Sequence, residues 1–198
     1  MNPTDQPLAE SSRLPLRPPP YAPDLEKYIH NNALTGLSPQ NLRLALAHQP
    51  QLAAAFQALA HVILFKCELP EREREIAIIR TGALTRSEYE WGMHVSIFGE
   101  KCGLGPQHVS DLTSCASWDE LNDTLWTGDE KLVVRAVDEL HQHSTVTDTT
   151  WERLRAHWSN AQLVELILSA GFYHMAAFFL NSMAVPLETG SARFPEGL

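Results

Sequence analysis

Basic residues are sparse in this sequence, and they form no cluster. Lysine and arginine account for 15 of the 198 residues, against 24 aspartates and glutamates, so the formal net charge is −9. Proteins that bind nucleic acid through its phosphates need a basic patch or stripe. The composition therefore argues against a nucleic-acid partner.

Cysteine is also scarce, with Cys67, Cys102 and Cys115 present and no Cys-x-x-Cys spacing. This pattern disfavours a disulfide framework, a zinc knuckle and a dithiol redox centre. Nine histidines are scattered along the chain. The nearest pair, His141 and His143, would point in different directions from a helix. We therefore expect no metal site and no cofactor.

The N-terminus lacks a charged start followed by an apolar run, which predicts a cytoplasmic protein without a secretory signal. Residues 160–183 are apolar over a length that would permit a membrane span. Glu165 and His174 would both be costly in lipid, however, and basic anchors are missing on both sides. We interpret this segment as a core or interface helix and expect no membrane partner.

Alternating apolar and polar runs typical of strands are absent, and the periodicity is helical from about residue 24 to residue 184. Residues 1–23 hold seven prolines, which favours an extended arm that either wanders or lies across a neighbouring subunit. We therefore divide the chain into a proline-rich N-terminal arm (1–23), a single all-α domain (24–184) and a C-terminal tail (185–198).

Helix boundaries are well marked and predict about eight helices. Segments 41–48 and 51–66 have helical periodicity, and Pro70 opens another helix with acidic residues in its first turn. Five pairs have the spacing of a capping box: Ser87 with Glu90, Ser117 with Glu120, Thr127 with Glu130, Thr149 with Glu152, and Ser159 with Gln162.

Glu90 and His94 are the most informative pair, because four positions on a helix place two side chains one above the other. A carboxylate beside an imidazole forms a general acid/base pair. On the preceding helix, Ile76, Ile79 and Ala83 predict a buried stripe, with Glu75 and Arg80 at its margins. If the two helices are antiparallel, Glu75, Arg80, Glu90 and His94 share one partly dry pocket.

Structural explanations exist for the same residues. Glu90 could only cap its own helix, or form a solvated pair with His94 worth a few tenths of a kcal/mol. Arg80 could simply pair with Glu75. Spacing alone leaves these alternatives open.

Several motifs occur in the order found in the carboxymuconolactone decarboxylase family, over roughly residues 50–130. They are Leu69-Pro70 through Arg80, then Tyr89-Glu90-Trp91-Gly92-Met93-His94, then Gly103-Leu104. Leu163–Ile167 and Gly171–Tyr173 resemble the closing helix of longer members. The resemblance implies an alkyl hydroperoxide reductase D-like (AhpD-like) all-α fold, an active-site helical hairpin, and a homotrimer or homohexamer.

Peroxidases of the same superfamily open the active-site helix with Cys-x-x-Cys-x-x-x-His. When the histidine of this motif is aligned with His94, the two thiol positions correspond to Ser87 and Glu90. The relay glutamate of the motif corresponds to Glu75. The chain thus keeps the proton-handling residues and lacks both sulfurs, so the resemblance does not imply dithiol chemistry here.

The favoured hypothesis is a cofactor-free acid/base enzyme, a decarboxylase or isomerase acting on a small lactone or keto acid. His94 would donate the proton, Glu90 would set its orientation and basicity, and Glu75 would complete the proton network. Arg80 would hold the substrate carboxylate or stabilise an oxyanion, with Trp91 and Tyr89 near the substrate. The alternatives are a peroxidase-type antioxidant enzyme that uses one of the cysteines, and a non-catalytic oligomeric binding protein.

Overall fold

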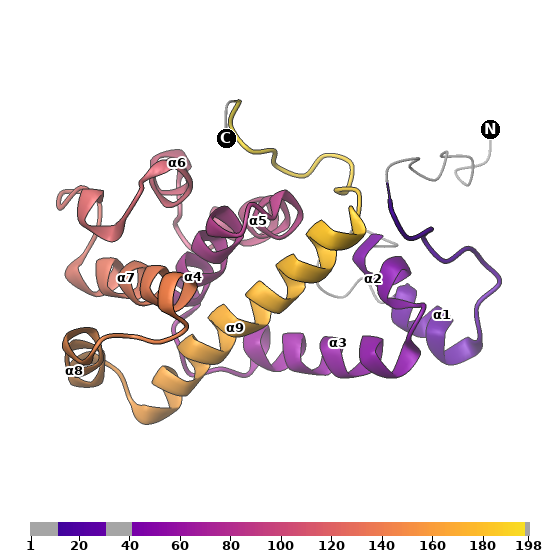
Figure 1. Ribbon diagram of the computed structural model, residues 1–198, viewed down its shortest axis with the longest axis horizontal. Coiled ribbons are helices and arrows are strands. Elements are labelled where there is room, and N and C mark those ends of the chain that lie inside the picture. Colours follow the sequence, from indigo (N-terminus) through magenta and orange to yellow (C-terminus); the bar gives the residue numbers. More distant parts are fainter. Residues whose placement is uncertain (1–11, 31–40, 197–198) are drawn as a thin grey trace.

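The computed structural model describes residues 12–30 and 41–196, and these residues form nine α-helices and no strand. The helices are α1 (Pro23–Ile29), α2 (Asn41–Leu46), α3 (Pro50–Phe65), α4 (Glu71–Leu84), α5 (Glu88–His94), α6 (Pro106–Ser114), α7 (Gly128–His143), α8 (Asp148–His157) and α9 (Asn160–Met183) (Figure 1). A π-helical turn, η1 (Val95–Gly99), continues α5, and a 3-10 turn, η2 (Trp118–Glu120), precedes α7. The predicted all-α fold is confirmed.

Helix α4 lies at the centre of the fold and packs against α5, α6, α7 and α9. Every residue from Arg74 to Gly82 is buried, so the predicted stripe with charged margins is wrong. The reason is that neighbouring helices surround α4 and leave no solvated side. Its charged side chains are instead neutralised inside the fold, because Arg74 binds Glu75 and Arg80 binds Asp138.

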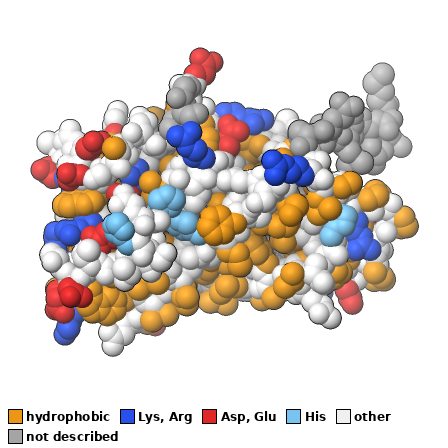
Figure 2. Space-filling model, viewed as in Figure 1, with side chains coloured by type: hydrophobic (Ala, Val, Ile, Leu, Met, Phe, Trp, Pro, Cys, Tyr) orange, Lys and Arg blue, Asp and Glu red, His pale blue; other side chains and the backbone are white. Residues whose placement is uncertain are grey.

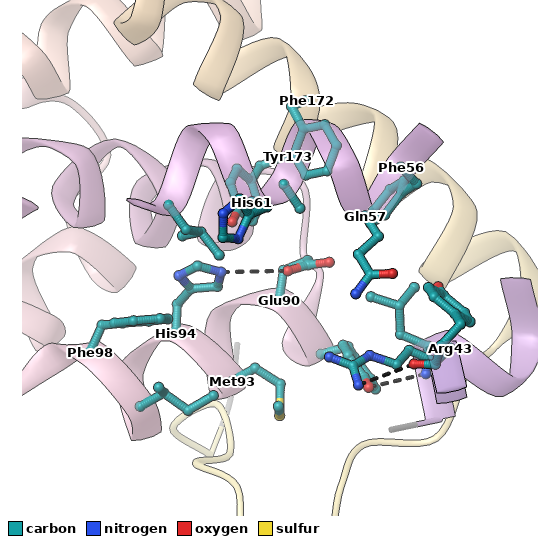
Figure 3. A pocket seen from close by; sticks show the side chains of 16 residues that line it. Arg43, Phe56, Gln57, His61, Glu90, Met93, His94, Phe98, Phe172 and Tyr173 are labelled. Carbon is teal, nitrogen blue, oxygen red and sulfur yellow. Dashed lines mark hydrogen bonds and ion pairs between the residues drawn. The ribbon is translucent and has the colours of Figure 1, made fainter. Parts of the chain in front are cut away.

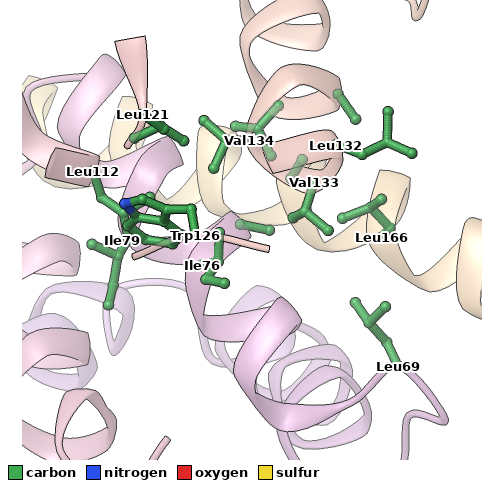
Figure 4. Packing of buried hydrophobic residues seen from close by; sticks show 14 of the residues in the cluster. Leu69, Ile76, Ile79, Leu112, Leu121, Trp126, Leu132, Val133, Val134 and Leu166 are labelled. Carbon is green, nitrogen blue, oxygen red and sulfur yellow. The ribbon is translucent and has the colours of Figure 1, made fainter. Parts of the chain in front are cut away.

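The main core fills the space between α4, α7 and α9. Ile76 and Ile79 of α4 face Val133 and Val134 of α7, and Leu166 of α9 lies beside them (Figure 4). All five side chains are almost completely buried. This packing fixes the position of α4, and α4 in turn supports the helix that carries His94.

Side-chain caps confirm some of the predicted helix starts and correct others. Thr127 with Glu130 and Ser159 with Gln162 form capping boxes at α7 and α9. Thr147, one residue before the first residue of α8, caps that helix in place of the predicted Thr149. Ser87 and Ser117 make no cap hydrogen bond. Glu90 therefore does not act as a capping residue.

Both ends of the described chain pack onto the domain. Arg13 N–H donates to Met183 O at 2.9 Å, and Arg17 Nη1 donates to Ala47 O at 2.7 Å. Residues 12–22 therefore lie along α2 and the end of α9 of their own chain, and contact of the arm with a neighbouring subunit stays a prediction. Residues 1–11 of that arm lie outside the described part.

The C-terminal segment runs over α5. Phe194 stacks on Trp91 with ring centroids 4.8 Å apart, and its N–H donates to Glu88. Gly92 leaves space for the carbonyl of Ala192, which a Cβ atom would displace. The segment thereby covers part of α5.

Candidate active site

A cavity of about 240 Å³ lies between α2, α3, α5 and α9 (Figure 3). Its wall is mostly aromatic and aliphatic, and its lining residues are Tyr28, Leu42, Arg43, Phe56, Gln57, Ala60, His61, Leu64, Tyr89, Glu90, Met93, His94, Ile97, Phe98, Phe172 and Tyr173. Glu90 and His94 are therefore brought together in one cavity, as the sequence predicted.

Close contact between α4 and α5 positions the imidazole of His94. A Cβ atom on Gly82 would lie only 3.0 Å from the Cβ and N atoms of Trp91, so the glycine permits this approach. As a result, Glu75 of α4 reaches across to His94 at the end of α5. The predicted helical hairpin is thus formed by α4 and α5.

Glu75 holds the inner side of the imidazole. Its Oε2 atom lies 2.7 Å from His94 Nδ1, and its Oε1 atom accepts a hydrogen bond from Arg74 Nε at 3.0 Å. Glu75 has no exposed surface. A carboxylate acceptor at this position requires Nδ1 to carry the proton, so Nε2 of the neutral ring has its lone pair directed away from Glu75.

Glu90 faces the other nitrogen. Its Oε2 atom lies 3.9 Å from His94 Nε2, and Figure 3 shows the two groups side by side at the cavity wall. Burial raises the pKa of Glu90 to about 7, against the lowering effect of nearby His94. Its carboxyl group is therefore ready to gain or lose a proton near neutral pH.

Aromatic rings enclose this pair on the side of the cavity. Tyr173 meets the His94 ring edge-on, with centroids 4.8 Å apart, and Phe98 lies 5.3 Å from it. The π-helical turn that begins at Val95 follows His94 directly, and such turns are frequent at functional sites. Burial raises the pKa of Tyr173 well above its usual value, so its hydroxyl stays protonated.

Tyr89 lines the cavity, and its hydroxyl group donates to Glu188 Oε1 at 2.6 Å and accepts from Leu42 N–H at 3.2 Å. These contacts connect α5 to α2 and to the C-terminal segment. Tyr89 therefore lies at the cavity wall, and its substrate-binding role stays a prediction.

Arg80 and Trp91 lie elsewhere. Arg80 Nε donates to Asp138 at 2.7 Å, and its Nη1 donates to the carbonyls of Leu112 and Cys115. Trp91 Nε1 donates to Thr113 at 3.0 Å. Neither side chain lines the cavity, so the structure does not support their predicted substrate-binding roles. Both face the interior because α5 and α4 bury those sides against α6 and α7.

Several cavity residues carried no recognisable signal in the sequence. Arg43 and Gln57 come from α2 and α3, and Phe172 and Tyr173 come from α9. Their positions depend on how three distant helices pack against α5. Phe172 and Tyr173 belong to the segment that resembles the closing helix of longer family members, and both lie at the cavity wall.

The thiols are separate from this site. None of the three cysteines lines the cavity, and all three are free. Burial raises the pKa of each thiol, which lowers the fraction of reactive thiolate. In the described ranges, 12–30 and 41–196, no group of three or more His, Cys, Asp or Glu side chains could hold a metal ion.

The sequence profile of the carboxymuconolactone decarboxylase family matches residues 50–112. Over this segment the chain is similar to members of that family. The match contains Glu75, Glu90 and His94, so the whole acid/base group lies within the family segment. Comparison with curated proteins finds no match.

Solved structures share the fold of this chain over most of its length. A peroxidase-related protein from Silicibacter sp. TM1040 has a TM-score of 0.76 at 17% identity, covering 93% of this chain and 96% of that chain. An AhpD-core, peroxidase-related protein from Ralstonia eutropha JMP134 has a TM-score of 0.77 at 19% identity, covering 91% and 94%. The debrominase Bmp8 in complex with 2,3,4-tribromopyrrole has a TM-score of 0.62 at 15% identity, covering 85% and 87%. At these identities the likeness concerns the fold alone, which is AhpD-like.

Proposed function

We propose that this protein is a cofactor-free proton-transfer enzyme, a decarboxylase or isomerase, acting on a small organic acid or lactone. The observation that carries the proposal is the arrangement around His94, with Glu75 2.7 Å from Nδ1 and Glu90 3.9 Å from Nε2 at the wall of a cavity. A buried imidazole between two carboxyl groups can accept and return a proton at neutral pH.

The buried groups have different roles in proton transfer. Glu75, held by Arg74, fixes the orientation of the imidazole ring. Glu90 and Nε2 of His94 face the cavity and share the mobile proton. In a decarboxylation, the C–C bond to the carboxylate breaks, CO2 leaves, and the electron pair left on carbon takes the proton from this pair. In an isomerisation, the pair removes a proton from one carbon and returns it to another.

The apolar wall favours such a reaction. Phe56, Phe98 and Phe172 surround the acid/base pair and keep it from bulk water. In a dry site, electrostatic effects on a developing carbanion are stronger than in water. Burial also keeps Glu90 protonated at a pH where an exposed glutamate would have lost its proton.

A thiol peroxidase receives less support, although two of the structural neighbours are described as peroxidase-related. Ser87 and Glu90 occupy the positions that resemble the thiol pair of the superfamily, and no cysteine reaches the cavity. A hydroxyl group and a carboxyl group form no disulfide.

The direct test is exchange of carbon-bound hydrogen in D2O, followed by NMR on a panel of small lactones and keto acids. Wild-type protein should exchange or release CO2 from at least one compound, and His94→Gln and Glu90→Gln should lose this activity. A variant with all three cysteines replaced by serine should keep it. Activity that survives His94→Gln, or that disappears with the cysteines, would refute the proposal.

We also propose that the protein works as a homo-oligomer, a trimer or hexamer, in the cytoplasm. Support comes from an apolar face on α3 and α9 (Figure 2), formed by the exposed side chains Leu52, Leu59, Val62, Phe65, Val164, Leu168, Met175 and Phe178. Among the described residues, α9 is the one helix whose length and composition would permit a membrane span. Half of its most apolar window is buried within the fold, as in the core helix of a water-soluble domain.

A further inference from the structure

The ionisable groups of the cavity lie at two opposite ends, with the acid/base pair at one end and a cation at the other. Glu90 and His94 lie on one side, and the guanidinium group of Arg43 lies across the cavity from them (Figure 3). Arg43 is only 5% exposed. Between these two ends the wall is formed by uncharged side chains, most of them aromatic or aliphatic. Any ligand that fills the cavity therefore meets a cation at one end and a proton-transferring pair at the other.

We propose that the cavity takes a flat, apolar monoanion of the aryl- or alkenyl-carboxylate class, with its carboxylate toward Arg43 and its reactive carbon toward Glu90 and His94. This inference rests on the proposed function and narrows its substrate class. The carboxylate then serves as a handle, and the bond that changes is a C–H bond at the opposite end of the molecule. Of the two reactions proposed above, this orientation favours isomerisation.

The size of the cavity limits the ligand. A volume of about 240 Å³ is below the usual range for drug-sized ligands. It corresponds to roughly eight water-sized groups, given about 30 Å³ for a water in the liquid. Four aromatic rings, of Phe56, Phe98, Phe172 and Tyr173, form much of the wall. Aromatic walls favour flat, unsaturated ligands because rings pack against each other face to edge or offset.

Electrostatics limit the ligand to one negative charge. Arg43 lies over the ring of Tyr28 at 6.0 Å and donates to the Tyr28 carbonyl at 3.4 Å. Its side chain is almost completely buried, and desolvation lowers its pKa. A ligand carboxylate at this end would lie beside a guanidinium group. A second carboxylate at the opposite end would meet Glu90 and, behind His94, Glu75, so a dianion is disfavoured.

The reaction that follows from this orientation needs no oxidant or second reactant. Glu90 or His94 takes a proton from a carbon of the substrate, and the electron pair is delocalised over the conjugated chain toward the carboxylate. The same pair then returns the proton to a different carbon. The product has the same atoms as the substrate with a shifted double bond.

Binding of model ligands tests the proposed preference for a monoanion, and it requires no catalytic turnover. The probes for calorimetry are trans-cinnamate as the monoanion, trans-cinnamamide as its neutral match, and terephthalate as a dianion with carboxylates at opposite ends. Wild-type protein should bind cinnamate at least tenfold more tightly than the other two. Binding of cinnamamide or terephthalate within tenfold of cinnamate, or no binding of cinnamate, would overturn the inference.

A matched pair of variants tests whether Arg43 is the cation that binds the ligand carboxylate. Arg43→Met should reduce cinnamate binding to the level of cinnamamide and leave cinnamamide binding unchanged, which also shows that the cavity is intact. Arg17→Met removes the same charge from a residue that packs against α2 outside the cavity, and it should keep the preference. Unchanged cinnamate preference in Arg43→Met would refute the role of Arg43. If that variant does not fold, the wild-type ligand series decides alone.

Failure of the function and failure of the ligand class are distinguishable. Glu90→Gln should keep cinnamate binding and lose proton exchange. Selective monoanion binding without exchange on any related acid would refute the proposed function and leave the ligand class standing. Exchange that proceeds only on dianionic substrates would refute the ligand class and support the function.

Discussion

His94 Nδ1 lies 2.7 Å from Oε2 of Glu75, a fully buried carboxylate nineteen residues earlier in the chain. This contact joins α4 to α5 and orients the ring. A carboxylate in this position fixes which nitrogen faces the cavity. It is the interaction on which the proposed acid/base activity most depends.

Glu75→Gln should lower kcat/KM about 10- to 100-fold, the range typical when an orienting partner of a functional histidine is removed. The amide can present its NH2 group to Nδ1 as well as its oxygen, so the orientation of the ring is no longer fixed. Glu71→Gln, one turn earlier on α4 and exposed, is the matched control and should behave as wild type. An unchanged kcat/KM in Glu75→Gln would show that Glu75 has only a structural role.

Glu90→Gln should stabilise the protein at alkaline pH. The pKa of Glu90 rises from 4.5 to about 7 on folding, so folding favours the protonated form. The stability it contributes is full below pH 4.5 and is lost as the pH rises toward 7. Removing the charge should therefore raise the free energy of unfolding at pH 8 by up to about 3 kcal/mol and change little at pH 4.

Thermal unfolding at both pH values measures this effect. Glu100→Gln, on the exposed surface beyond η1, is the control and should show no such pH dependence. Equal unfolding temperatures for wild type and Glu90→Gln at pH 8 would contradict the buried, protonated state of Glu90.

The helices were predictable because local chemistry determines them. Prolines open α3 and α6, and capping boxes at Thr127 and Ser159 begin α7 and α9. These signals act within a few residues and need no knowledge of the fold. The all-α class and most helix starts follow from them.

The site was only partly predictable, because its contacts join separate helices. The i,i+4 rule correctly placed Glu90 beside His94, yet the shorter contact to His94 comes from Glu75 on another helix. Arg80 occupies a central helix whose surroundings are set by α6 and α7, so its burial had no local signature. Arg43 reaches the cavity from α2 through tertiary packing alone.

Arg80→Met should destabilise the protein by about 3–5 kcal/mol, because it leaves Asp138 buried without its cation. The variant also loses the hydrogen bonds from Arg80 to the Leu112 and Cys115 carbonyls. Urea unfolding measures the loss. The double variant Arg80→Met/Asp138→Leu should recover part of it, since neither charge is then left alone. Lost activity at unchanged stability would instead restore the substrate-binding interpretation.

The apolar face on α3 and α9 should mediate self-assembly. Phe178 is 66% exposed on this face, and a charge there would be buried in an interface at high cost. Phe178→Asp should therefore shift the mass measured by analytical ultracentrifugation from trimer or hexamer toward monomer. Trp151→Asp, on α8 and outside this face, is the control. A wild-type protein that sediments as a monomer would refute the assembly.

His141 should make the junction of α7 and α9 sensitive to acid. Its Nδ1 lies 2.9 Å from Nε2 of His174, and His174 Nδ1 donates to the Ala170 carbonyl. Burial and then the neighbouring His174 lower the pKa of His141, with Asp138 acting in the opposite direction and Arg80 adding to the lowering. The folded protein therefore binds this proton less readily than the unfolded chain.

The free energy of unfolding should consequently fall as the pH drops below about 6.5, the ordinary pKa of a histidine side chain. This decrease should level off at pH values below the lowered pKa of His141 in the folded state. His141→Asn should remove this part of the pH dependence when unfolding by urea is measured between pH 5 and pH 8. His143→Asn, two residues further along and exposed, should leave it intact. An identical pH dependence in wild type and His141→Asn would show that the histidine pair contributes nothing to acid sensitivity.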